Sequence, residues 1–195
     1  MSKDANAISA AQNTAVREIK DADVHGKLDV SSLVLVAILL AAAFILNATV
    51  GNALAITGIK PEFCIAAYCL AILLIRPRLP QAVLIGILAA TVIQITTSIP
   101  GLEYVADIPA SAVMCLIVTQ LFHAGKPLYL PFAATFLTTV VSGLIFATIA
   151  TTVVLGGALG SVVVMFPIVF GTALANGIVV QALYPALKKV HRTRA

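Results

Sequence analysis

Residues 33–56, LVLVAILLAAAFILNATVGNALAI, decide the fold, because they form a long apolar run in which only Asn47, Thr49 and Asn52 carry polar side chains. An α-helix needs about 20 predominantly apolar residues to cross about 30 Å of hydrocarbon. Asp29, Ser31 and Ser32 directly precede the run and are of the residue types that cap helix N-termini. The stretch therefore predicts a transmembrane helix.

The whole chain has the composition of an integral membrane protein. Its apolar fraction is 61% and its mean hydropathy is +1.07, whereas soluble domains average roughly 45 to 50% apolar residues. The 195 residues suffice for one domain of about six crossings. We expect an all-α protein of the cell membrane.

Five further apolar runs follow the first and predict five more membrane helices, at residues 62–75, 81–97, 108–122, 130–155 and 161–187. Pro77 and Pro80 separate the second helix from the third, since proline interrupts a helix. Residues 102–107, with Glu103 and Tyr104, are expected to form an acidic outer loop. Residues 1–30 and 191–195 are predicted to be cytoplasmic tails of a membrane domain at residues 31–190.

The distribution of basic residues predicts the orientation. With six spans both termini share a side, and placing them inside puts eleven of the 12 lysines and arginines in the cytoplasm, so that only Lys60 is outside. Positive residues are enriched on the cytoplasmic side of membrane proteins. Both termini are therefore expected to be cytoplasmic, and the net charge of +4 does not indicate a nucleic-acid partner.

No group of residues in the sequence predicts catalysis. All histidines fall in predicted cytoplasmic segments, and no predicted span holds a pair of carboxylates. The cysteines lie in apolar runs without a CxxC pair, and residues 156–160 lack the lysine of a phosphate-binding loop. We expect neither an enzyme nor a bound cofactor or metal.

Four amide side chains are candidates for binding a solute, because a polar group inside a bilayer is costly unless it faces protein or water. Internal packing of the same groups is the alternative. The candidates are Asn47, Asn52, Gln94 and Asn176.

Charged and aromatic residues near the predicted outer side suggest a zwitterionic solute. Lys60 is placed to bind a carboxylate, and either Asp107 or Glu62 to bind an ammonium group. Phe63 and Tyr104 are expected to pack against an aromatic or apolar part of the ligand.

Several short motifs resemble the bacterial tryptophan transporter family, TrpP, over about residues 32–190. They are Gly58-Ile59-Lys60-Pro61-Glu62, Arg76-Pro77-Arg78, Thr96-Thr97-Ser98-Ile99-Pro100-Gly101, Asp107-Ile108-Pro109, Phe166-Pro167, Ala175-Asn176 and Tyr184-Pro185. The resemblance implies uptake of tryptophan or a related aromatic compound. The chain departs from the family in its longer N-terminal tail and in Ile108, where a lysine is common.

That family is in turn similar to the S components of energy-coupling factor transporters, which are six-helix subunits that bind vitamins or related solutes. In those proteins an alanine stripe on the first helix docks a transmembrane T subunit that works with ATPases, and Ala37 and Ala41 match this stripe. Packing within the chain is the alternative role of the stripe.

Two other functions stay open. One is an S component for another vitamin-like ligand, and the other is a non-transporting membrane scaffold whose N-terminal tail recruits a partner. A ligand-induced melting screen distinguishes an S component for another ligand from a tryptophan transporter. Deletion of residues 1–29 distinguishes a scaffold, which should fail without this tail, from an uptake protein, which should still bind its solute. The sequence does not indicate the source of energy.

Overall fold

The chain folds as a bundle of helices. The computed structural model describes residues 29–54, 61–97, 99–123 and 129–194, and no β-strand occurs among them. The predicted cytoplasmic tail before residue 29 and the predicted Lys60 loop lie outside the described residues. The all-α prediction is confirmed.

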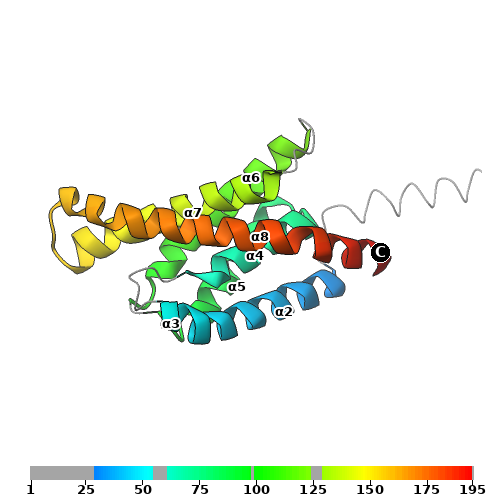
Figure 1. Ribbon diagram of the computed structural model, residues 1–195, viewed down its shortest axis with the longest axis horizontal. Coiled ribbons are helices and arrows are strands. Elements are labelled where there is room, and N and C mark those ends of the chain that lie inside the picture. Colours follow the sequence, from blue (N-terminus) through cyan, green and yellow to red (C-terminus); the bar gives the residue numbers. More distant parts are fainter. Residues whose placement is uncertain (1–28, 55–60, 98, 124–128, 195) are drawn as a thin grey trace, which may run out of the picture.

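Six helical segments follow one another along the described residues (Figure 1). The first joins α2 (Val30–Leu46), the π-helix η1 (Asn47–Gly51) and α3 (Asn52–Leu54), and is followed by α4 (Phe63–Ile75), α5 (Leu79–Ile93) and α6 (Leu102–His123). The fifth joins α7 (Leu130–Ile149) to the π-helix η3 (Ala150–Val154), and the sixth joins the 3-10 helix η4 (Leu159–Met165) to α8 (Phe166–Arg194). Four segments are long and apolar enough to cross a membrane, whereas α4 and α5 are shorter apolar helices.

Helix α4 forms the centre of the bundle. Eleven of its 13 residues are buried, and α2, α5, α6, α7 and α8 all pack against it. A helix that is apolar on every side is expected to lie in the interior. With about 1.5 Å of rise per residue, α4 is roughly 20 Å long, and neighbouring helices rather than lipid surround it.

Helix α2 packs on the bundle through one face only. Asp29 caps it, because its side chain accepts a hydrogen bond from the backbone N–H of Ser32 at 2.8 Å. The buried positions Val36, Leu40 and Ala43 then recur at intervals of four and three residues, as one face of an α-helix requires. Asp29, one of the three N-cap candidates in the sequence, is confirmed as the cap, whereas Ser31 and Ser32 lie inside the helix. The opposite face of α2 is exposed.

The prediction of an acidic outer loop at residues 102–107 is wrong. These residues form the first turns of α6, and both Glu103 and Asp107 are buried. Glycine at Gly101, with φ of +87°, provides the turn that starts the helix. The two carboxylates are four residues apart and therefore lie on the same face of α6.

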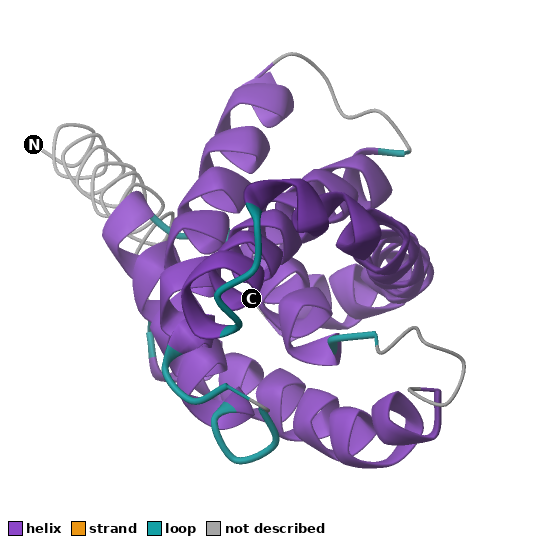
Figure 2. Cartoon of the chain, turned by 90° about the vertical axis from the view of Figure 1, so that its left-hand side faces the viewer, coloured by secondary structure: helices purple, strands orange, loops and turns teal. Residues whose placement is uncertain are grey.

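Both ends of the described chain lie at the same end of the bundle, where α2 starts and α8 finishes (Figure 1). The opposite end carries the turn between α5 and α6 and the connection between η3 and η4 (Figure 1). Figure 2 looks onto that opposite end.

Candidate solute-binding site

A cavity of about 360 Å³ opens at the end of the bundle where α4 and α6 begin and where η3 finishes. Pockets for small molecules commonly measure about 300 to 1,000 Å³, so this one can hold a single small solute. Every helical segment contributes to its wall. The polar and acidic lining residues are Asn47, Glu62, Thr96, Thr97, Glu103, Thr139, Ser142, Thr151 and Thr172.

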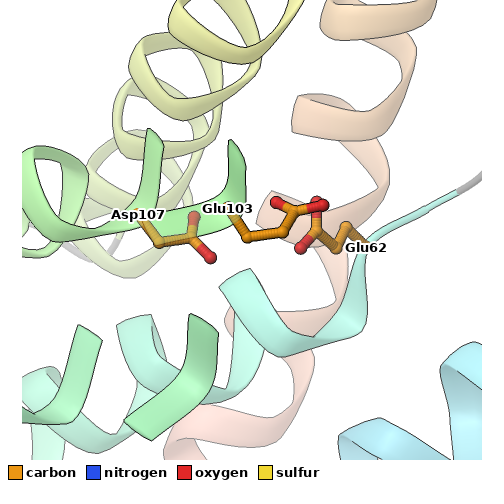
Figure 3. Close-up of side chains that lie close together, drawn as sticks. All are labelled: Glu62, Glu103 and Asp107. Atoms are coloured by element: carbon orange, nitrogen blue, oxygen red, sulfur yellow. The ribbon is translucent and has the colours of Figure 1, made fainter. Parts of the chain in front are cut away.

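Three carboxylates gather beside this cavity. Glu62 projects from the segment before α4, and Glu103 and Asp107 project from the first turns of α6 (Figure 3). One oxygen of each carboxylate lies within 4.8 Å of the others. Two like charges about 4 Å apart repel by about 4 kcal/mol at an effective dielectric constant of about 20, so the group favours a cation in its midst.

Asp107 is the most deeply placed of the three, with 0% of its surface exposed. Its Oδ1 accepts hydrogen bonds from Ser142 Oγ at 2.8 Å and from the Tyr68 hydroxyl at 3.5 Å. Its Oδ2 has no hydrogen-bond partner among the described residues. A buried acceptor without a partner is costly, and here it points to a ligand that supplies a donor or a positive charge.

Two buried asparagines hold the junction between Glu62 and Phe63. Asn47 Oδ1 accepts a hydrogen bond from the backbone N–H of Phe63 at 2.7 Å, which caps the first turn of α4. Asn176 Nδ2 donates to the backbone carbonyl of Glu62 at 3.1 Å. The α2 and α8 segments therefore both fix the place at which Glu62 enters the site.

The other predicted contacts lie around the cavity rather than on its wall. The side chain of Gln94 accepts a hydrogen bond from the backbone N–H of Gly101 and donates one to the carbonyl of Ala90 in its own helix. The Tyr104 hydroxyl donates a hydrogen bond to the Thr91 hydroxyl. Gln94 and Tyr104 therefore both connect α5 to the start of α6. Phe63 is buried in the main core. Asn52 is exposed and donates to the carbonyl of Ala48 in its own helical segment.

Lys60 and the alanine pair Ala37 and Ala41 are the remaining predicted residues. Lys60 lies outside the described residues. Ala37 and Ala41 are exposed on the outer face of α2, beside the exposed Ile38 and Ile45. The structure therefore brings together Asn47, Glu62 and Asp107 of the predicted binding residues, with Asn176 directly behind Glu62.

The sequence reasoning missed four residues of the site: Glu103, Thr139, Ser142 and Phe146. Glu103 was assigned to a loop, although its spacing of four residues from Asp107 and eight from Ser111 is that of one helix face. Thr139, Ser142 and Phe146 recur at intervals of three and four residues, which is the corresponding signal on α7. Phe146 is the only aromatic residue on the described cavity wall.

The remainder of the wall is apolar. It includes the side chains of Ile65, Ile93, Met165, Ile168 and Val169. A small solute with one apolar part and one positively charged part would meet both of its requirements here, because the apolar wall and the carboxylates belong to the same cavity.

The fold and this cavity define an α-helical, multi-pass membrane protein with a solute site near one end of its bundle. The model of the tryptophan transporter family TrpP matches residues 29–192, and the chain belongs to this family. It is accordingly a membrane transporter for tryptophan. No curated protein and no solved structure matches the chain. Membership of a transporter family favours a protein without catalytic activity.

Proposed function

We propose that the chain takes up tryptophan by binding it, as a zwitterion, in the cavity beside Glu62, Glu103 and Asp107. The single observation that carries this proposal is the pairing of three clustered carboxylates with an apolar wall in one cavity. Tryptophan offers the matching groups, namely an ammonium and a large aromatic ring. The family assignment supports the same solute.

The ammonium group of the solute is assigned to Glu62 and Asp107. Glu62 lies on the cavity wall, and Asp107 is joined to the wall through Ser142. Charge-assisted hydrogen bonds contribute about 1.5 to 3 kcal/mol each. Glu103 lies between the two acids in the same group, so it reinforces the attraction (Figure 3).

The carboxylate of the solute is assigned to Lys60, which follows from the charge pattern of the sequence. Pro61, which lines the cavity, and Glu62 directly follow Lys60 in the chain, so the lysine starts within reach of the site. The indole ring is assigned to the apolar wall, where Phe146 can pack against it.

The predicted amide and aromatic residues take different roles in this proposal. Asn47 lines the cavity and can contact the solute. Asn176, Gln94, Tyr104 and Phe63 act by holding Glu62 and the start of α6 in place, as their contacts support. The position of Asn52 supports no contact with the solute.

We also propose six membrane crossings with both termini in the cytoplasm, so that the cavity opens outward. The four basic residues whose side chains are described, Arg76, Arg78, Lys188 and Lys189, lie in or near the helix ends opposite the carboxylates. This distribution agrees with the enrichment of positive residues on the cytoplasmic side. The short helix α4 would then cross within a shell of other helices, whereas α5 would lie at the periphery with Leu84 and Leu88 exposed.

A similarity to S components is part of the proposal, with the exposed face of α2 as the docking surface for a T subunit. Ala37 and Ala41 lie on that face, and small residues allow close helix approach in a membrane. Replacing both by leucine should release a co-purifying T subunit and leave tryptophan binding unchanged. Retention of the partner by this variant would contradict the docking assignment.

Tryptophan binding can be measured directly, because the chain contains no tryptophan of its own. The indole emission of the ligand is therefore read without a background from protein tryptophan, and calorimetry gives the affinity. Tryptamine, which lacks the carboxylate, and indole-3-propionate, which lacks the ammonium, divide the recognition into its two halves.

Recognition of the ammonium and recognition of the carboxylate predict opposite orders of ligand affinity in two variants. Asp107→Asn should weaken tryptophan and tryptamine by about 1.5 to 3 kcal/mol and leave indole-3-propionate unchanged. Lys60→Gln should weaken tryptophan and indole-3-propionate and leave tryptamine unchanged. Asp29→Asn removes a carboxylate at the other end of the bundle and keeps a good capping residue, so it is the matched control.

Equal losses for all three ligands, or none, would contradict the assignment of these charges. A vitamin that stabilised the purified protein more than tryptophan does would instead favour the alternative S-component function. Deleting residues 1–29 should leave tryptophan binding intact, whereas a scaffold that acts through this tail would lose its partner.

A further inference from the structure

The hairpin made of α7–η3 and η4–α8 extends further at the cavity end of the bundle than α3 and the α5–α6 turn do (Figure 1). Helix α7 alone has 20 residues, which is about 30 Å at 1.5 Å per residue and already crosses the hydrocarbon of a bilayer. The part of α8 from Phe166 to Lys188 is at least as long. The hairpin tip, defined here as residues 153–164, therefore lies at or beyond the edge of the hydrocarbon.

The surface of the hairpin tip is nevertheless apolar. The exposed fractions of Val153, Leu155 and Leu159 are 74%, 73% and 70%. No charged residue occurs in the sequence between Lys126 and Lys188. Leaving such side chains in water costs about 25 cal/mol for each Å² of apolar surface, and exposed apolar patches mark sites of interaction with membranes or proteins. Bulk water is therefore an unfavourable environment for the tip.

The backbone of the tip excludes the opposite environment, the hydrocarbon itself. Residues 155–158 are not helical, and Gly156 has φ of +64°. Irregular backbone that faces lipid does not occur in the hydrocarbon region, because its N–H and C=O groups would lack partners. The headgroup layer meets both requirements, since it holds water for the backbone and borders the acyl chains for the side chains.

We propose that the hairpin tip inserts into the headgroup layer of the leaflet on the cavity side, so that its partner is the lipid surface. The tip continues the exposed apolar faces of the two arms, where Leu137 and Phe170 are 50% and 44% exposed. Leu155 and Met165, at the two ends of the tip, also line the cavity. One side of the cavity mouth therefore borders the headgroup layer. This placement does not depend on the identity of the solute.

The absence of tryptophan from the chain makes the depth of the tip measurable. Leu159→Trp introduces the only tryptophan, and the full-length variant is placed in phosphatidylcholine nanodiscs without solute. Its emission is read with iodide in the water, with lipid brominated near the headgroup, and with lipid brominated near the chain end. Lipid brominated near the headgroup should quench the emission more than lipid brominated near the chain end. Iodide should quench it at least about threefold less than it quenches N-acetyltryptophanamide in water.

Leu137→Trp is the matched control, because Leu137 is a half-exposed leucine well inside α7. It should show the reverse order, with stronger quenching by lipid brominated near the chain end. Val164→Trp, at another position that is 70% exposed, replaces Leu159→Trp if the melting temperature shows that the latter does not fold.

Three results would overturn the proposal. Full quenching by iodide with none by brominated lipid would place the tip in water. Stronger quenching by lipid brominated near the chain end would place it in the hydrocarbon. Protection from iodide and from both brominated lipids would show that a protein partner or a second copy of the chain covers the tip.

Discussion

Helix α4 and the segment formed by η3 and η4 show how differently two parts of this bundle are held. Nearly all of α4 is buried in one large cluster of side chains contributed by α2, α4, α5, α6, α7 and α8. Near η3 and η4 a second cluster contains only Ala147, Val162 and Val169 as buried members. The cavity lies against the second region, which therefore combines the solute site with far fewer buried apolar side chains than the core around α4 has.

This difference suggests how a solute enters. Regions with few buried contacts open at a lower free energy than the core does. Leu155, which follows η3, and Met165, the last residue of η4, both line the cavity. Interruptions of regular helix geometry such as the π-helix η3 are also common at functional sites. We expect this segment to move while α4 stays in place.

Hydrogen exchange should give the largest contrast between the two regions. Backbone amides of α4 are expected to exchange about a thousandfold more slowly than those of Ala150–Val154 and Leu159–Met165, which corresponds to about 4 kcal/mol of opening free energy. Mass spectrometry of the protein in nanodiscs measures both regions in one sample. Equal protection of the two would show that the contrast in buried contacts does not govern their opening.

Truncating one leucine in each region should give the next largest effect. Leu73 of α4 is 1% exposed, whereas Leu159 of η4 is 70% exposed. Leu73→Ala leaves a cavity and should cost about 2 kcal/mol, the lower end for such changes, because lipid provides no hydrophobic drive between helices. Leu159→Ala should change the unfolding free energy by less than about 0.5 kcal/mol. Denaturant titration in mixed micelles measures the unfolding free energy of both variants. Equal losses of unfolding free energy would contradict the difference in packing between the two regions.

Much of this architecture could be predicted from the sequence, because apolar runs and prolines are local signals. The start of α7 at Leu130 was located to the residue and α4 to within one residue, and Asp29 was one of three candidates for the N-cap of α2. The burial of Glu103 could not be read in the same way. A charged residue after a proline and a glycine resembles a loop, and only the packing of α6 against α4, α5 and α7 shows that it faces inward.

The candidate site was predicted less completely for a related reason. Residue type indicates which side chains could bind a charged solute, and on that basis Glu62, Asp107 and Asn47 were predicted. It did not distinguish a wall residue such as Phe146 from a core residue such as Phe63, because both lie in apolar helices. That distinction depends on which face each helix turns toward the cavity, and the packing of all segments together decides it.

Close contact between α5 and α6 gives the third prediction. A Cβ atom at Gly86 would lie 2.7 Å from Ser111 Cβ, one turn beyond Asp107, whereas a Cβ atom at Gly160 would meet no heavy atom within 4 Å. Gly86→Ala should therefore destabilise the protein by about 1 to 2 kcal/mol through overpacking. Gly160→Ala is the control and should be neutral. A thermal melt of both variants tests this, and an unaffected Gly86→Ala variant would show that α5 and α6 separate easily.

Ser142 offers the smallest and most local test, because it joins the well-packed region to the cavity. Its hydroxyl donates to Asp107 Oδ1 at 2.8 Å, and the residue also lines the cavity. Ser142→Ala removes one hydrogen bond to a carboxylate, so tryptophan affinity should change by about 1 kcal/mol, or about fivefold, while stability changes little. Tyr68→Phe removes the longer contact at 3.5 Å from the core side and should change affinity less. Calorimetry on both variants ranks the two contacts. A larger effect from Tyr68→Phe would mean that the core around α4, rather than the cavity wall, holds Asp107 in its binding position.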